Sequence, residues 1–287
     1  MSQQNEPLPA LAITGSTGNL GGLVAKELAA AGMEQRLVVR DLARAPQFDG
    51  TRAVVCSYSD AAAAELALAG VDVLFMVSAA EAVDRLAQHI TFIDAAARAG
   101  VAHVVYTSFV GAAADATFTL ARDHFATEQH LRASGMDYTI LRDNFYLDFL
   151  PQLAGDDGVI RGPGGSGAFA GVARTDVARC ATAVLRDPAV HRGQTYNLTG
   201  PEDLTLAQAA VVISTATGRD IRFHEETLEE AYASRASYNA EPWQLDAWVS
   251  TYTAMGSGEL GGVSPDVHGL TGHDPLSLAD VLAQPVL

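Results

Sequence analysis

The stretch LAITGSTGNLGG, residues 11–22, decides the fold of this chain. It begins as an apolar strand, turns at Gly15, Gly18 and Gly21, and continues as a helix with apolar residues at helical spacing. Gly15 permits a sharp turn off the strand, Gly18 a close approach of backbone to a pyrophosphate, and Gly21 close packing of the helix on the sheet. Phosphate groups would meet free N–H groups at the positive end of the helix. The order of strand, glycine turn and helix therefore predicts a dinucleotide site.

The spacing of these glycines is G-x-x-G-x-x-G, whereas the dehydrogenase fingerprint is G-x-G-x-x-G. A glycine-rich turn between a strand and a helix also arises for purely steric reasons. The motif alone leaves both interpretations open, and the rest of the chain has to decide between them.

The composition is that of a globular protein with an acidic surface. The 287 residues suffice for one large domain, or for a domain with an appendage. Acidic residues number 34 and basic residues 18, so the formal net charge of −16 disfavours nucleic acid and anionic lipid as partners. No apolar run approaches the roughly 18 residues of a membrane span, so no membrane insertion is expected. An anionic cofactor would have to be held by local donors.

Two features favour a reducing, cytoplasmic location. The two cysteines, Cys56 and Cys180, lie far apart and lack the spacing of metal ligands. The first nine residues carry neither a basic residue nor an apolar core, so no secretory signal is expected. Since the chain also has no His-x-x-x-His pair, we predict no metal site.

Short apolar runs alternate with alanine-rich helical patterns through the first half of the chain. Strands are expected at 10–14, 36–40, 52–56, 71–77, 101–107 and 136–142, and helices at 19–31, 60–69, 80–99 and 119–134. A glycine follows each of these helices and precedes the next strand, at Gly32, Gly70, Gly100 and Gly135. This pattern predicts an α/β fold with a Rossmann-type, doubly wound parallel sheet.

The pattern changes after residue 150. Residues 155–171 are rich in glycine and predict a turn and hairpin, with a lid as the alternative. Beyond them we expect a helix at 175–186, a strand at 194–199 and helices at 205–217 and within 227–255. We therefore predict a Rossmann domain for NAD(P) at 8–150, to which 172–200 returns. The smaller, mainly α-helical, substrate-binding part would comprise 151–171 and 201–287.

The second expected strand ends in Arg40 and Asp41, which present two chemistries side by side. An acid at this place in a Rossmann unit binds the ribose hydroxyls of NAD, whereas an arginine accommodates the 2′-phosphate of NADP. Arg40, with Arg44 nearby, favours NADP(H) over NAD(H), because a guanidinium binds a phosphate through two charge-assisted bonds. Two alternatives stay open, a solvated charge for Arg40 and a helix cap for Asp41.

Several pieces of sequence occur in the order typical of one family. They are residues 13–21 (ITGSTGNLG), 39–40 (VR), 57–60 (SYSD), 69–72 (AGVD), 106–108 (YTS), 138–142 (YTILR), 173–179 (ARTDVAR), 196–201 (YNLTGP) and 270–273 (LTGH). With these pieces the chain resembles the NmrA-like atypical short-chain dehydrogenases, and among them the NAD(P)H:quinone oxidoreductase and triphenylmethane reductase group. The likeness runs from residue 12 to residue 282.

The resemblance implies a set of cofactor contacts. The pyrophosphate would lie on the turn residues Gly15, Thr17, Gly18, Asn19, Leu20 and Gly21. Arg40 would bind the 2′-phosphate, and Ser57 would lie near the adenine, where the family often has an aspartate. Val77, Ser78 and Ala79 would pass the nicotinamide ribose. For Ser78, a cap of the helix expected at 80–99 is an equal alternative.

A departure from the wider superfamily concerns the mechanism. Short-chain dehydrogenases typically use a Tyr-x-x-x-Lys pair, but Leu120 stands at the tyrosine position and His124 at the lysine position. His124 is the predicted contact to ribose or substrate, with a histidine satisfied at the sheet surface as the alternative. Ser108 occupies the catalytic serine position. We therefore predict His124 and Ser108 as the catalytic residues.

Aromatic residues gather after the sixth expected strand, where cofactor and substrate meet in an open α/β sheet. Phe145, Tyr146 and Phe149, together with Phe109, would form the wall of an apolar pocket for a flat acceptor, and ordinary packing is the alternative. Asn144 is predicted to contact the cofactor.

These observations favour an NADPH-dependent oxidoreductase that acts on quinone-like or other conjugated small molecules. Such acceptors delocalise the charge that a hydride brings, so they need no strong protein acid, and solvent or His124 can supply the proton. The second hypothesis is a redox sensor of the NmrA type that binds NAD(P) without catalysis. A sugar-nucleotide epimerase ranks last, because it needs the tyrosine. We expect a monomer or homodimer with a small-molecule substrate.

Overall fold

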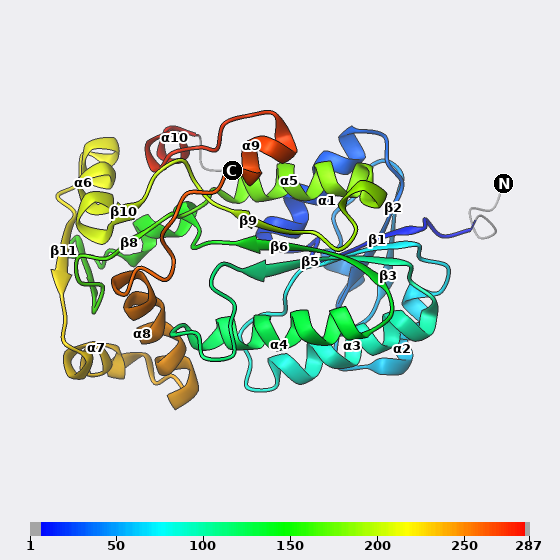
Figure 1. The fold of residues 1–287 in the computed structure, drawn as a ribbon, viewed down its shortest axis with the longest axis horizontal. Coiled ribbons are helices and arrows are strands. Elements are labelled where there is room, and N and C mark those ends of the chain that lie inside the picture. The colour runs from blue at the N-terminus through cyan, green and yellow to red at the C-terminus, as the bar shows by residue number, and fades with distance from the viewer. Residues whose placement is uncertain (1–6, 285–287) are drawn as a thin grey trace. The chain divides into compact units, whose positions relative to one another are not determined.

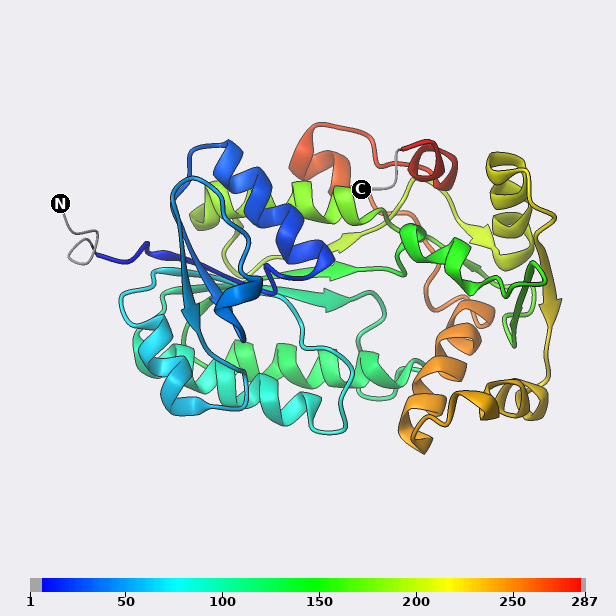
Figure 2. The ribbon, with the colours of Figure 1, turned by 180° about the vertical axis from the view of Figure 1, so that it is seen from behind.

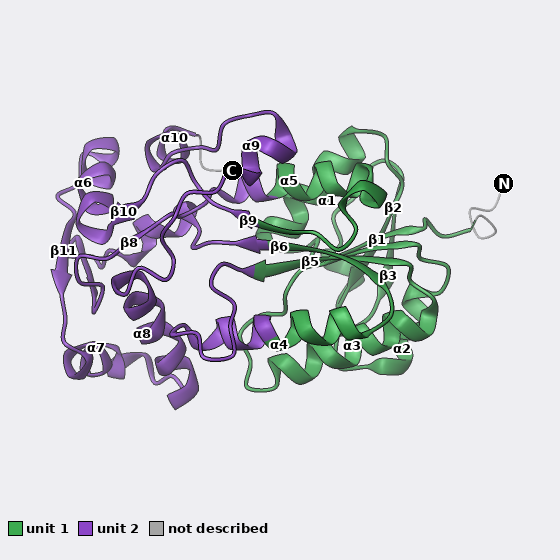
Figure 3. Ribbon diagram, viewed as in Figure 1, with its two compact units in different colours: residues 1–108, 126–141, 178–196 green, residues 109–125, 142–177, 197–287 purple. Residues whose placement is uncertain are grey.

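The computed structural model describes residues 7–284, and residues 1–6, part of the segment considered for a secretory signal, lie outside it. Contacts within the chain define two compact units (Figure 3). Unit 1 comprises residues 1–108, 126–141 and 178–196, and unit 2 comprises residues 109–125, 142–177 and 197–287.

A seven-stranded sheet with the order β3-β2-β1-β4-β5-β6-β9 forms the centre of unit 1 (Figure 1). Its strands are β1 (Leu11–Thr14), β2 (Gln35–Val39), β3 (Thr51–Val55), β4 (Val73–Met76), β5 (His103–Phe109), β6 (Asp137–Asp143) and β9 (Thr195–Leu198). β1 pairs in parallel with both β2 and β4, with Ala12 opposite Arg36 on one side and Leu74 on the other. The chain order therefore reverses at β1, as in a doubly wound Rossmann sheet, and the predicted fold class is confirmed.

Helices cover both faces of this sheet (Figures 1 and 2). α1 (Asn19–Ala30) and α5 (Arg174–Arg186) lie on one face, and α2 (Ala61–Leu68), α3 (Arg85–Ala99) and α4 (Thr119–Ala133) lie on the other. The second face packs through a core of apolar side chains that includes Met76, Phe92, Ile93, Val104 and Leu131. These apolar residues recur at helical and strand spacing, which is why the sequence predicted the layers.

One predicted boundary in unit 1 is wrong. The helix expected at 80–99 begins only at Arg85, preceded by Asp84. Residues 77–80 form neither helix nor strand. Ser78 therefore does not cap a helix, and this alternative for Ser78 is excluded.

Unit 2 contains two small sheets and most of the C-terminal helices. Its strands are β7 (Val159–Gly162), β8 (Ala168–Phe169), β10 (Leu204–Thr205) and β11 (Arg222–Glu225). Its helices are α6 (Leu206–Thr217), α7 (Leu228–Arg235), α8 (Pro242–Gly256), α9 (Asp266–Thr271) and α10 (Leu278–Ala283). Short 3-10 helices occur along the chain at Leu42–Arg44 (η2), Leu147–Leu153 (η3), Pro188–His191 (η4) and Ala236–Tyr238 (η5).

The turn and hairpin predicted within residues 155–171 are confirmed only in part, because Ala154 and Ile160 form an antiparallel bridge around a turn but β7 and β8 do not pair with each other. β7 pairs in parallel with β11, and β8 pairs antiparallel with β10, so these two strands belong to different sheets. Gly167, between these strands, packs against main chain, since a Cβ on it would lie 2.3 Å from Gly256 O at the end of α8. Gly165 has φ +54° and lies in a turn, so it serves the turn, whereas Gly167 serves close packing.

No helix within residues 7–284 has both the length and the apolar character needed to cross a membrane.

Candidate functional site

The glycine turn after β1 has the geometry that its sequence predicted. Gly15 has φ +66°, which a residue with a side chain adopts only under strain, and its carbonyl accepts the N–H of Gly18 at 2.9 Å. A Cβ on Gly21 would lie 2.4 Å from Gly15 O and 2.8 Å from Thr14 O. The first turn of α1 therefore packs directly on the end of β1, and only glycine fits there.

The N-terminus of α1 opens on this turn. Its N-cap residue, Gly18, makes no side-chain hydrogen bond to the helix, and the first turn carries no acidic residue. Thr17, Gly18 and Asn19 are exposed, while the side chain of Leu20 is buried in the core, so Leu20 can offer a ligand only its backbone. An uncapped helix end with exposed backbone fits the pyrophosphate of a dinucleotide.

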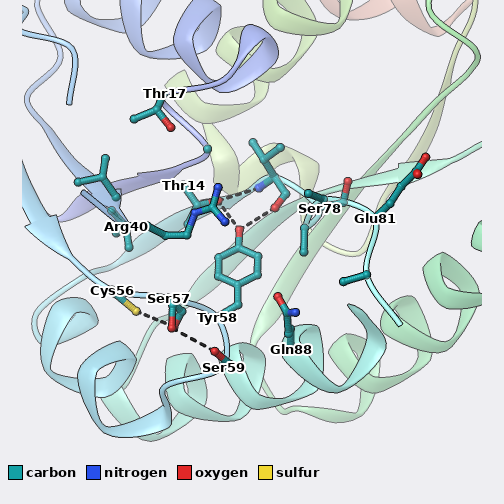
Figure 4. Close-up of a pocket in the computed structure, with 17 residues that line it drawn as sticks. Thr14, Thr17, Arg40, Cys56, Ser57, Tyr58, Ser59, Ser78, Glu81 and Gln88 are labelled. Carbon is teal, nitrogen blue, oxygen red and sulfur yellow. Dashed lines mark hydrogen bonds between the residues drawn. The ribbon is translucent and has the colours of Figure 1, made fainter. Parts of the chain in front are cut away.

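A pocket of about 380 Å³ lies beside this turn, at the carboxyl ends of β1, β2, β3 and β4 (Figure 4). The predicted cofactor residues that line it are Gly15, Thr17, Arg40, Ser57, Val77, Ser78 and Ala79. Further residues in its wall are Thr14, Val38, Val39, Cys56, Tyr58, Ser59, Ala80, Glu81, Ala82 and Gln88. All of them belong to unit 1. Arg40, Ser57 and residues 77–79 thus share one cavity with Gly15 and Thr17, whereas the other predicted pyrophosphate contacts, Gly18, Asn19, Leu20 and Gly21, are not among the residues that line it.

Arg40 and Asp41, adjacent in sequence, have different roles. Arg40 directly follows β2, is exposed and lines the pocket (Figure 4). Asp41 accepts the N–H of Ala43 at 2.9 Å and caps η2. The cap is the alternative that the sequence left open for Asp41. Because the carboxylate is used there, the guanidinium is the charged group that remains for a nucleotide, which favours a 2′-phosphate.

Tyr58 is a pocket residue whose role the sequence did not indicate. Its hydroxyl lies 2.6 Å from both Thr14 Oγ1 and Val77 O (Figure 4). Its ring stacks on Phe92, with 4.2 Å between the ring centres. Burial raises the pKa of Tyr58 well above its ordinary value, so the hydroxyl stays protonated. Tyr58 thus joins the ends of β1 and β4, and no local sequence pattern predicts such a contact.

Ser108, predicted as catalytic, has a buried partner. At the end of β5, its hydroxyl donates to Glu128 Oε1 of α4 at 2.6 Å, and both residues are 0% exposed. Arg132 lies 3.6 Å from the second oxygen of the same carboxylate. The serine proton therefore points into the core, which favours a structural role. The sequence places Glu128 one helical turn after His124 on the same face, but nothing in it indicates Ser108 as the partner of Glu128.

His124 and Phe109 lie together in unit 2. The imidazole of His124 is buried and stacks on Phe109, with 6.2 Å between the ring centres, and Phe118 meets Phe109 from another side at 5.0 Å. The ring of His124 is therefore part of an aromatic cluster. The alternative that the sequence left open was a histidine satisfied at the sheet surface, and the observed ring contact is with Phe109, the last residue of β5.

The polar side chains after β6 are engaged within unit 2. Asn144 donates from Nδ2 to Leu260 O at 2.9 Å and accepts the N–H of Phe145 at 2.7 Å, which favours a structural role over the predicted cofactor contact. The hydroxyl of Tyr146 donates to Asp143, and the guanidinium of Arg174 lies 4.8 Å from the centre of its ring. Burial, followed by the charge of Asp143, raises the pKa of Tyr146 well above its ordinary value.

Of the aromatic residues predicted to form the wall of an apolar pocket, Phe145 is packed against other rings and Phe149 is partly exposed. Phe145 packs against Phe169 and Phe149, with ring centres 6.2 and 6.0 Å away. Phe149 itself is 39% exposed. Ordinary packing accounts for Phe145, and Phe149 keeps an exposed aromatic edge.

A doubly wound parallel sheet, a glycine turn and an uncapped helix end at its switch point together define a Rossmann-type dinucleotide-binding protein. The model of the NAD(P)H-binding family matches residues 15–188, more than half of this chain. The chain therefore belongs to the NAD(P)H-binding family.

Curated relatives cover nearly the whole chain. Quinone oxidoreductase 2 of Escherichia coli is 32% identical over 94% of this chain and 96% of its own length. The NAD(P)H azoreductase of Xenophilus azovorans is 29% identical over 93% of this chain and 95% of its own. These relatives confirm the resemblance to the quinone oxidoreductase group.

Solved structures agree with these relatives. The NADPH-dependent quinone oxidoreductase of E. coli in complex with NADPH has a TM-score of 0.87 at 31% identity, covering 95% of this chain and 98% of that one. The triphenylmethane reductase of Citrobacter reaches 0.84 at 28% identity, with the same coverage. NmrA, a negative transcriptional regulator, matches at 0.74 and 16% identity over 96% of this chain and 95% of its own, a likeness of fold alone.

Proposed function

We propose that this protein is an NADPH-dependent oxidoreductase that reduces quinone-like or other conjugated small molecules without a Tyr-x-x-x-Lys pair. The observation that carries the proposal is the pocket of unit 1, which is lined by Gly15 and Thr17 of the glycine turn, by Arg40 and by residues 77–79. The uncapped N-terminus of α1 directly follows this turn. The relatives support the same reaction class, since two are named as reductases of a quinone and of azo compounds.

In this proposal, the residues of unit 1 bind NADPH and orient it. Backbone N–H groups at the start of α1 would hold the pyrophosphate, Arg40 the 2′-phosphate, and Val77–Ala79 the nicotinamide ribose. Bound NADPH supplies the hydride that reduces the acceptor. The contribution of the protein is proximity, since it holds the reacting groups in place without solvent reorganisation.

The proton requirement supports a conjugated acceptor. Leu120 has no hydroxyl to donate, and the hydroxyl of Ser108 donates to Glu128. Quinones and triarylmethane cations delocalise the added charge, so His124 or solvent suffices as the proton source. We assign Phe109, Phe145 and Tyr146 to the acceptor side. Residues 8–150 with 172–200 would form the cofactor domain, and 151–171 with 201–287 the substrate part.

The test follows NADPH oxidation against a panel of quinones and a cationic triarylmethane dye. We expect turnover with at least one acceptor and a preference for NADPH over NADH. Calorimetry with NADPH and NADP⁺ runs in parallel. Tight binding of cofactor without turnover on any acceptor would overturn the enzymatic proposal in favour of a redox sensor, whose affinities for the two cofactor forms must differ. We further propose that the protein is cytoplasmic and is a monomer or homodimer. Sedimentation would measure the oligomeric state.

A further inference from the structure

The pocket segment Val77–Ala79 is held by side chains along its backbone. Thr14 Oγ1 accepts the N–H of Val77 at 2.9 Å, and Thr107 Oγ1 accepts the N–H of Ser78 at 2.8 Å. The segment belongs to no helix or strand, so these bonds determine its path.

The end of this segment is held by α3. Nε2 of His89 accepts the N–H of Ala79 at 2.8 Å, while Nε of Arg85 donates to Ala79 O at 2.9 Å. Neither residue is among the predicted site residues. A helix that began at residue 80 would have used Ala79 O in its first turn and left the N–H of Ala79 without an intrahelical partner. Because α3 begins only at Arg85, side chains of this helix bind both backbone groups of Ala79.

The bonds of His89 fix its protonation state. A backbone N–H can only donate, so Nε2 carries no proton, and Nδ1–H donates to Thr127 Oγ1 of α4 at 2.9 Å. His89 is 0% exposed, and the rings of Tyr58 and Tyr106 lie 6.2 and 5.8 Å away. Burial and the charge of Arg85 lower the pKa of His89 to about 3. The neutral ring is thus a fixed link between α4 and the pocket segment.

We propose that His89 is a positioning residue for the NADP(H) cofactor, which fixes Val77–Ala79 along the pocket and is itself oriented by Thr127. The inference rests on the proposed function, because the cofactor is the expected occupant of the pocket. A ribose and nicotinamide bound along this segment need its backbone in one conformation before binding. Loss of the acceptor at Nε2 leaves the N–H of Ala79 unpaired, and the segment can move.

Unit 1 supplies a matched control in a second histidine-threonine pair. His103 is 3% exposed, and its Nε2 lies 2.8 Å from Thr139 Oγ1. It begins β5, at the amino end of the strand, whereas the pocket lies at the carboxyl ends of the strands. The pair has the burial and bond length of His89 and Thr127 but makes no part of the pocket wall.

The experiment compares His89→Phe, His89→Gln, Thr127→Val and His103→Phe with the wild type. We expect His89→Phe to raise the Kd for NADPH about tenfold, because a bond of this kind contributes roughly one decade of affinity. Glutamine places an acceptor near the Nε2 position, so His89→Gln should recover most of the loss. Thr127→Val, which keeps the imidazole, should raise the Kd about threefold. His103→Phe should lower thermal stability and leave the Kd within twofold.

A second readout needs no cofactor. Amide exchange at residues 77–79 of the free protein should become faster in His89→Phe and stay unchanged in His103→Phe. The inference is overturned when the wild type binds NADPH and His89→Phe binds it equally well, or when His103→Phe weakens binding as much. A wild type that binds no NADPH would instead overturn the proposed function. If His89→Phe does not fold, the Kd for NADPH and the amide exchange at residues 77–79 of Thr127→Val test the inference in its place.

Discussion

The polar groups predicted for the site behave differently in the two units. In unit 1, Arg40 and the turn residues Gly15 and Thr17 line a pocket, while the side chains of Tyr58, Thr107 and His89 hold the backbone around it. In unit 2, the amide of Asn144 and the hydroxyl of Tyr146 bond to other groups of the protein. A short sequence motif was therefore enough to predict the nucleotide-binding residues of unit 1, whereas residue type alone did not predict which residues of unit 2 would be available to an acceptor.

The largest effect is expected at Gly21, where the neighbouring backbone leaves no space for a side chain. Gly21→Ala places a Cβ 2.4 Å from Gly15 O, so it should lower stability by more than about 3 kcal/mol and abolish NADPH binding. Calorimetry and urea denaturation would measure both. Gly269→Ala in α9 of unit 2 is the control, since its Cβ would meet no atom within 4 Å and alanine favours a helix. Normal binding by Gly21→Ala would contradict the close packing at this turn.

Acid should destabilise unit 1 through His89. Its folded pKa of about 3 lies below the ordinary 6.5, so between these values the unfolded chain binds a proton that the folded chain excludes. Stability is therefore fully present above pH 6.5 and falls as the pH falls, by about 1.4 kcal/mol per pH unit. Urea denaturation of wild type and His89→Gln from pH 7 to pH 4 would measure it. If the free energies of unfolding of the two proteins fell equally with pH, His89 would not be the cause of the loss of stability.

Arg40 should determine the choice between the two cofactors. Arg40→Ala removes the charged partner of the 2′-phosphate, so the Kd for NADPH should rise about 100-fold, equivalent to about 2.7 kcal/mol. The Kd for NADH should change little. Arg44→Ala is the matched control, because Arg44 is exposed at the end of η2 and is not among the residues that line the pocket. Equal losses for both cofactors would assign Arg40 to another part of the nucleotide.

Ser108→Ala gives the smallest expected effect on turnover and so tests whether Ser108 takes part in the chemistry. Because its hydroxyl donates to buried Glu128, the change should cost about 2 kcal/mol of stability and alter kcat by less than about threefold. A general acid would contribute a factor of roughly 100 or more. Steady-state kinetics with the best acceptor would separate the two roles, and a loss of that size would restore Ser108 as catalytic.

The fold could be predicted because its determinants are local. The apolar runs, the helical spacing and the glycine after each helix each span a few residues, and the strands of the seven-stranded sheet overlap the predicted ranges. The short strands β10 and β11 of unit 2 were not predicted. The errors arose where distant groups compete for the backbone. Residues 80–84 have helical composition, yet Arg85 and His89 bind Ala79 and α3 starts late. Residues 155–171 have the composition of a hairpin, yet β7 and β8 pair with β11 and β10 and not with each other.

The site follows the same division. Gly15, Gly21 and Arg40 belong to motifs that can be read in sequence. Tyr58 and His89 bond to partners that lie 19 and 38 residues away along the chain, Val77 and Thr127. Glu128 pairs with Ser108, 20 residues away. A single sequence contains no signal for such pairs, because each residue type is also common in ordinary cores.

The uncapped start of α1 has a consequence for how this site tolerates mutation. Its binding groups are backbone amides, and every amino acid except proline carries one. Under the proposed function, most substitutions at an exposed position such as Asn19 would therefore leave the pyrophosphate contact intact, while a single change at Arg40 would remove the proposed contact to the 2′-phosphate. Phosphate binding would then tolerate changes in sequence, whereas cofactor choice would depend on one side chain.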